Sequence, residues 1–405
     1  MPPAGPAQRA AIEALLRTGL PATRDENWKY ANLRALERQR FVSSPAKSPA
    51  ALPASIPAAL PDHVRFVFVD GVLAPQLSAP LSAAGGVVTL EQRAIASART
   101  PGPDERFALL NRAFAPAPLS IRVPAAGAAG AIELLFLASC GAEHGASYPR
   151  LSLELAAGAS LSLIERHVSA TEHGNFVVSA VDVALGRGAQ LQHYRLQELN
   201  ARSTLFDTLA AQLATQADYR LYAVASGAQA ARSTLALRHV GEQASVLLAL
   251  AALGTRAQVQ DTYALIEHVA PQARTTQIFR GIAAGRSRVA CNGKIVVARG
   301  AHGTDSRQSL RGLLAGAEAE IDVRPQLEIY TDDVRCSHGA TAGKLDDDML
   351  FYLLSRGLTP DTAQRLLKWA FLEDVIAQIE LPGLRRQIEE RLAAQLGDDT
   401  VRALL

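Results

Sequence analysis

Cysteine is scarce in this sequence. Its 405 residues include only three, Cys140, Cys291 and Cys336, and no two of them form a C-x-x-C pair. An odd count without paired spacing argues against a disulfide framework and indicates a reducing, cytoplasmic setting. It also excludes a four-cysteine metal or cluster site built from this chain alone.

Long apolar runs and an excess of charge are also lacking. The longest apolar runs, such as Val246–Leu253, are far shorter than the roughly 20 residues that cross a bilayer. The 41 basic and 39 acidic residues nearly balance and are scattered along the chain, which is not the pattern of a nucleic-acid-binding surface. We therefore expect neither a membrane nor a nucleic acid among the partners.

Common nucleotide-binding and hydrolase motifs are missing. The sequence has no P-loop G-x-x-x-x-G-K-[ST], no strand-linked G-x-G-x-x-G, no H-E-x-x-H and no G-x-S-x-G. If ATP is consumed in the function of this protein, a partner must hydrolyse it.

The first 115 residues are predicted to form a small helical region. Helices are expected at 7–18, 26–36 and 104–114, where apolar residues recur at helical spacing. Five prolines between residues 45 and 61 indicate a linker, and Asp70-Gly71 between two apolar segments predicts a β-hairpin.

A weak repeat occupies the middle of the chain, which we predict to be a right-handed parallel β-helix over residues 116–342. Short alternating segments are punctuated by a unit of small residue, alanine, polar and apolar residue. Its alanines, at 159, 189, 217 and 244, are separated by 30, 28 and 27 residues. A near-constant step through strand-rich sequence is typical of stacked coils. A β-sandwich, whose strands also alternate, is the alternative.

From residue 343 to 405 the pattern changes to helix. Helices are predicted at 346–355, 361–379 and 384–396, the second of them starting after the Thr359-Pro360 cap. A helical domain therefore follows directly on the last predicted coil.

The segment 331–341, TDDVRCSHGAT, contains the strongest candidate site. Cys336 and His338 lie two residues apart, so on a strand their side chains leave the same face. A thiolate and an imidazole are a soft pair of metal ligands, but two ligands do not complete a site. Asp332 and Asp333 add oxygen ligands nearby. The remaining ligands must come from distant residues or from another protein.

Two alternatives remain open on the residues alone. Cys291 and His302 lie in the last predicted coils and, with Cys336 and His338, could form a mononuclear zinc site. A carbohydrate-active β-helix enzyme could instead use Asp332 and Asp333, although adjacent strand residues point to opposite faces.

Three other features are interpreted as structural. The pairs Glu165/His167 and Glu172/His173 are expected on solvent-facing strand positions, and Cys140 is expected to be buried packing.

Four segments resemble the SufB/SufD family of iron–sulfur cluster assembly proteins. They are ENWKY at 26–30, PQLEIY at 325–330, DDVRCSHGAT at 332–341 and LFYLLSRG at 350–357. The third has the form found in the branch that pairs with SufB, and the chain lacks the cysteine-rich segments expected of SufB itself.

The resemblance implies a non-catalytic scaffold. Such proteins form a heterodimer with SufB through their β-helices, and their C-terminal helices bind the ATPase SufC. A transient cluster is implied at the interface with SufB, with His338 essential and Cys336 beside it, and no cofactor is expected in the isolated chain, which could form a homodimer. The residues implied in SufC binding are Leu345, Met349, Phe351, Tyr352, Arg356, Leu366, Leu367 and Phe371.

Overall fold

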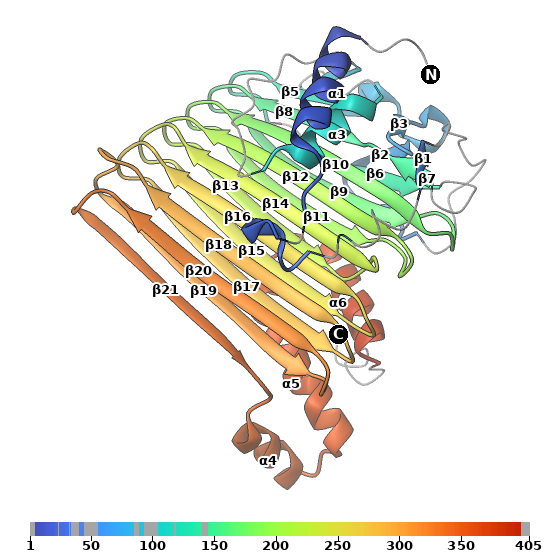
Figure 1. The fold of residues 1–405 in the computed structure, drawn as a ribbon, viewed down its shortest axis with the longest axis vertical. Helices are drawn as coiled ribbons and strands as arrows, with labels where there is room; N and C mark the ends of the chain where they lie inside the picture. The colour runs from blue at the N-terminus through green and yellow to red at the C-terminus, as the bar shows by residue number, and fades with distance from the viewer. Residues whose placement is uncertain are drawn as a thin grey trace.

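The computed structural model describes residues 5–22, 24–31, 33, 40–43, 56–84, 89–92, 104–116, 119–128, 130–139 and 145–397. Most of them belong to two facing β-sheets (Figure 1). The 11-stranded sheet contains β1 (Val42–Ser43), β4 (Thr89–Gln92), β5 (Leu119–Val123), β7 (Gly145–Ser147), β8 (Arg150–Leu155), β10 (Asn175–Leu185), β12 (Thr204–Leu213), β14 (Ala230–His239), β16 (Val259–His268), β18 (Arg288–Val297) and β20 (Glu320–Ile329). The 10-stranded sheet contains β2 (His63–Val69), β3 (Val72–Leu73), β6 (Ala131–Ala138), β9 (Ser160–Ser169), β11 (Gln190–Glu198), β13 (Asp218–Ala225), β15 (Ser245–Gly254), β17 (Arg274–Ala284), β19 (Thr304–Ala315) and β21 (Val334–Gly343).

The connectivity is that of a parallel β-helix. From β8 onward successive strands alternate between the two sheets, and each pairs in parallel with the strand two places along the chain. This order confirms the predicted β-helix and excludes the β-sandwich, whose strands pair antiparallel. The hairpin at Asp70-Gly71 is also confirmed, because β2 and β3 pair antiparallel across it.

The repeated alanines form a stack at one corner of the β-helix. Ala159, Ala189, Ala217 and Ala244 are all completely buried. Each follows a residue with positive φ, namely Gly158, Gly188, Gln216 and Gln243. A left-handed residue turns the chain sharply there, and a small side chain fits beneath the coil that follows. The weak sequence repeat is therefore the signature of this corner.

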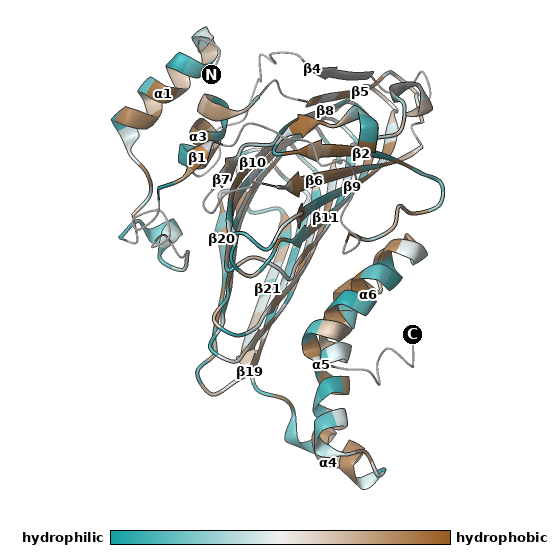
Figure 2. Cartoon of the chain, turned by 90° about the vertical axis from the view of Figure 1, so that its right-hand side faces the viewer, coloured by the Kyte–Doolittle hydropathy of each residue, from teal (hydrophilic) through white to brown (hydrophobic). Residues whose placement is uncertain are grey.

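The sheets enclose a core, and helices cover part of their outer faces. The inner faces enclose an apolar lumen, and Figure 2 shows helices on either side of the two sheets. Helices α1 (Pro6–Thr18) and α3 (Arg106–Phe114) lie on one side, with the short helices η1 (Glu26–Trp28), η2 (Pro75–Leu77) and η3 (Leu81–Ala84) also preceding the main coils. Among the described residues, no helix has the length and apolar character that a membrane span requires.

Trp28 anchors the N-terminal region to the 11-stranded sheet. Its ring contacts Phe107 of α3 and Phe206 of β12, and the guanidinium of Arg232 lies 4.7 Å from the ring centroid. The helix predicted for 26–36 is wrong at its start. Glu26–Trp28 form a single 3₁₀ turn instead, and Trp28 at its end is buried. Much of the rest of that prediction, most of the proline-rich linker and Cys140 lie outside the described residues.

Three helices follow β21, as predicted. They are α4 (Asp347–Ser355), α5 (Pro360–Ile376) and α6 (Pro382–Leu396). The side chain of Asp346 accepts a hydrogen bond from Met349 N, and that of Thr359 accepts one from Thr362 N, so both starts are capped. α5 and α6 pack on the outer face of the 10-stranded sheet.

Candidate functional site

The β-helix has an open end at its last coil. β20 and β21 are the terminal strands of their sheets, and no described strand pairs with their outer edges. Figure 1 shows β21 at the border of the molecule, with α4 directly beyond its end. Most residues of β21 are exposed. An unpaired edge of this length is a template for pairing with another chain.

Cys336 and His338 lie two residues apart on β21, so both leave the same face of the strand. Cys336 is half-buried and packs against the lumen core, and burial raises the pKa of its thiol. His338 is exposed. Their register partners on β19 are Ser306 and Gln308, both buried. The pair is therefore presented at the open end above two polar side chains.

The predicted accessory residues do not gather around this pair. Asp332 and Asp333 are exposed and precede β21, where the backbone oxygen of Asp333 accepts a hydrogen bond from Gly303 N. Cys291 is buried inside the lumen, and burial raises its pKa far above the usual range. His302 lies on an exposed turn with its ring near Gly300 O.

No self-contained metal site is present in the described part of the chain. No group of three or more His, Cys, Asp and Glu residues there could hold a metal ion. Cys336 and His338 alone therefore do not complete a metal site.

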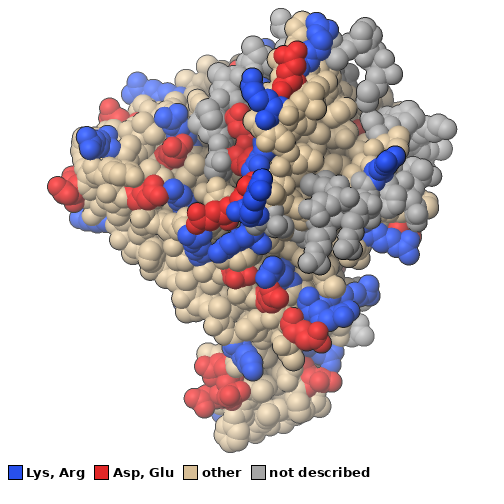
Figure 3. Space-filling model, viewed as in Figure 1, with Lys and Arg blue, Asp and Glu red and all other residues tan. Residues whose placement is uncertain are grey.

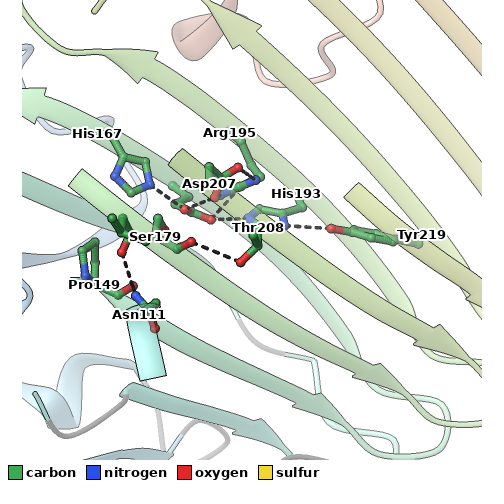
Figure 4. A network of polar contacts seen from close by, with 11 residues as sticks. Asn111, Pro149, His167, Ser179, His193, Arg195, Asp207, Thr208 and Tyr219 are labelled. Carbon is green, nitrogen blue, oxygen red and sulfur yellow. Dashed lines mark hydrogen bonds and ion pairs between the residues drawn. The ribbon is translucent and has the colours of Figure 1, made fainter. Parts of the chain in front are cut away.

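A buried polar network lies deeper in the β-helix (Figure 4). Glu165 accepts hydrogen bonds from Arg195 at 2.8 and 2.9 Å and contacts His167 Nε2 at 2.7 Å and His193 Nε2 at 3.1 Å. Arg195 also pairs with Asp207. Burial alone would raise the pKa of Glu165, but the charge of Arg195 and hydrogen bonds from His167, His193 and Arg195 hold it well below its usual range.

This network overturns one sequence interpretation. Glu165 and His167 were expected to face solvent, yet both are buried, whereas Glu172 and His173 are exposed as expected. Both residues are buried because the β-helix covers both faces of the strand that carries them. A strand here has no solvent face, because one face lines the lumen and the other lies under helices. The three consecutive polar residues Glu165, Arg166 and His167 give no sequence signal that separates a buried strand from a solvent-facing one.

An apolar surface covers α4. Met349, Phe351 and Tyr352 are exposed by 58, 72 and 56%, and Leu354 is exposed as well. The guanidinium of Arg356 lies over the Tyr352 ring, 5.1 Å from its centroid. Figure 3 shows the tip of the molecule formed by this region as largely uncharged, with acidic side chains beside it. Exposed apolar side chains gathered on one short helix indicate a protein-binding surface.

The other residues predicted to bind the ATPase are less accessible. Leu345 and Phe371 pack against the apolar layer between α5, α6 and the sheet, and Leu366 and Leu367 are half-buried. The predicted set therefore divides into four accessible residues, Met349, Phe351, Tyr352 and Arg356, and four that are partly buried.

Comparison with known proteins gives a consistent result. The sequence profile described as "SUF system FeS cluster assembly, SufBD core domain" matches residues 137–371. The chain is 32% identical to the iron-sulfur cluster assembly protein SufD of Escherichia coli, over 96% of this chain and 93% of that protein. It is 30% identical to an iron-sulfur cluster assembly SufBD family protein of Synechocystis, over 95 and 89% of the two chains. Protein ABCI7, chloroplastic, of Arabidopsis thaliana is 28% identical over 62 and 53%.

Proposed function

This chain belongs to the SufB/SufD family of iron–sulfur cluster assembly proteins, in its SufD branch, and from that premise we propose that it is a non-catalytic scaffold whose open end pairs with SufB. Its role lies in the assembly of iron–sulfur clusters by the SUF system. The cluster is cargo of the complex, and ATP hydrolysis belongs to the partner SufC.

The unpaired edge of β20 and β21 is the single observation that carries the SufB proposal. Strand addition to these edges would continue both sheets and hydrogen-bond the free backbone groups of the last coil. Cys336 and His338 would then lie at the junction of the two chains. In the absence of SufB, the same edges could pair two copies of this chain.

The incomplete ligand set supports a shared cluster site. An iron–sulfur cluster is commonly held by about four side chains, and Cys336 and His338 supply two. A cysteine of SufB is proposed to complete the set, with His338 as the essential ligand from this chain. Cys336 is half-buried and protonated when free, so its thiol would lose a proton on binding iron.

The apolar surface of α4 is the proposed SufC contact. Only residues 344–346 separate β21 from α4. A movement of α4 driven by the ATP cycle of SufC would therefore act directly on the strand that carries Cys336 and His338. We propose that the helical unit from residue 343 onward conveys this movement to the interface.

Co-expression with SufB and SufC tests this arrangement. Phe351→Ser should reduce SufC recovery after affinity purification while SufB still co-purifies, because Phe351 lies on α4 and not on the strand edge. Leu16→Ser is the matched control, since Leu16 is an exposed leucine on α1. Full recovery of SufC with Phe351→Ser would contradict the proposed contact.

A further inference from the structure

A pair of buried amides lies directly beneath the candidate site. Gln277 on β17 and Gln308 on β19 are register partners and face the lumen. Gln308 Nε2 donates to Gln277 Oε1 at 2.8 Å and to the backbone oxygen of Gly293 at 3.0 Å. Both side chains are almost completely buried, at 0 and 4% exposure. A buried amide needs hydrogen-bond partners, so the contacts that it makes fix its orientation.

Gly293 on β18 keeps the space that these amides occupy. A Cβ atom at this position would lie 2.7 Å from Gln277 Oε1 and 2.8 Å from Gln308 Nε2. Contacts this short are not tolerated, so any larger residue would displace the amides. The glycine and the two glutamines therefore form one arrangement that holds the Gln308 amide in a fixed orientation.

The fixed orientation leaves one atom of Gln308 unsatisfied. Both N–H groups of its amide are used, one toward Gln277 and one toward β18. Its Oε1 atom is buried and has no hydrogen-bond partner among the described residues. In a ladder of side-chain amides along a sheet, each amide donates through its nitrogen to one neighbour and can accept through its oxygen from the other. Since the nitrogen of Gln308 donates back to Gln277, its oxygen is the atom through which a continued ladder would accept from the next coil.

The residue at that position of the next coil is His338. Gln308 and His338 are register partners on β19 and β21. Neighbouring strands lie about 4.8 Å apart, a gap that a glutamine oxygen and an imidazole can bridge. Because His338 is exposed, its ring is free to turn about its side-chain bonds.

We propose that Gln308 is a positioning residue for His338: its Oε1 atom accepts a hydrogen bond from one ring N–H. That bond fixes the tautomer and directs the other ring nitrogen, with its lone pair, to the open end. Metal-binding imidazoles commonly donate their second N–H to a carbonyl in this way. The inference deepens the proposed function, since it rests on His338 as a ligand at the interface.

The tautomer of His338 in the full chain, free of SufB, provides the test. Nitrogen-15 NMR distinguishes the two ring nitrogens, and the signals that vanish in His338→Asn identify this residue among the nine histidines. Gln308→Met, which is similar in size and lacks the acceptor, should change the tautomer ratio by about fivefold, the shift that one net hydrogen bond supports. The wild-type ratio should also differ by about fivefold from that of a free peptide spanning residues 334–343, in which Gln308 is absent.

Ser306→Ala is the control, because Ser306 lies two residues away beneath Cys336. It should leave the ratio unchanged. An equal ratio in the wild type and Gln308→Met would overturn the inference, and so would a wild-type ratio equal to that of the free peptide, even if Gln308→Met did not fold. These outcomes are independent of cluster assembly, so they are distinguishable from failure of the proposed function.

Discussion

Arg280 and Asp374 join the body of the β-helix to the helical unit. Arg280 Nε on β17 donates to Asp374 Oδ2 on α5 at 2.7 Å. Its Nη1 atom donates to the backbone oxygens of Phe279 and of Ser309, at 2.8 and 3.0 Å. Ser309 is the register partner of Gly339, next to His338. One buried guanidinium therefore links α5 to β17 and to β19, the strand that pairs with β21.

Replacing this link should loosen the open end. We expect Arg280→Met to lower the free energy of unfolding by about 2–4 kcal/mol, because hydrogen bonds to a charged, buried group are lost. Amide hydrogen exchange along β21 should become faster at the same time. Arg311→Met is the control, since Arg311 is the exposed register neighbour of Arg280 and should change stability by less than about 0.5 kcal/mol. Equal effects of the two variants would refute the link.

The buried network around Glu165 should be a major contributor to stability. Glu165→Gln would leave Arg195 with one carboxylate in place of two and would disturb two imidazoles. Removing one partner of a buried ion pair lowers stability by about 3–5 kcal/mol. Urea unfolding of Glu165→Gln and of the exposed control Glu172→Gln measures the difference. A loss no larger than that of the control would contradict the importance of the network.

Two other buried histidines predict a loss of stability in acid. His239 and His268 stack with ring centroids 4.4 Å apart, and the Oγ1 atom of Thr275 lies 3.1 and 3.0 Å from their Nε2 atoms. Burial lowers the pKa of His268 to about 4, and burial together with the neighbouring His268 lowers that of His239 well below its usual range.

The direction of the effect follows from these shifts. Between about pH 6.5 and pH 4 the unfolded chain binds protons that the folded chain does not, so stability falls as the pH falls. Each histidine contributes at most about 1.4 kcal/mol per pH unit in this window. The unfolding free energy of His268→Gln should therefore decline less steeply from pH 7 to pH 5 than that of the wild type. Parallel declines would argue that His268 titrates normally.

Some of the fold could be predicted because it depends on short-range rules. The stack of alanines at the corner of the β-helix needs a small residue once in every coil, and the regular spacing of residues such as Ala159 and Ala189 made it visible in the sequence. The start of α5 required a cap, which Thr359-Pro360 supplied. The common face of Cys336 and His338 followed from strand geometry alone.

The rest depends on contacts between residues distant in the sequence. Glu165 and Arg195 are 30 residues apart and meet only because two coils are in register. The partner of Gln308 could not be identified without the register of β19 and β21. Trp28 forms its contact with Phe206, far along the chain. Local patterns contain no information on which coil lies above which residue.

Iron and sulfide bound to the complex test the central claim most directly. We expect the complex with SufB and SufC to assemble at normal yield when this chain carries His338→Ala, yet to hold little or no iron and acid-labile sulfide after co-expression. His302→Ala, at an exposed histidine on a neighbouring turn, should retain both. A His338→Ala complex with the iron and sulfide content of the wild type would contradict the assignment of His338 to the cluster site.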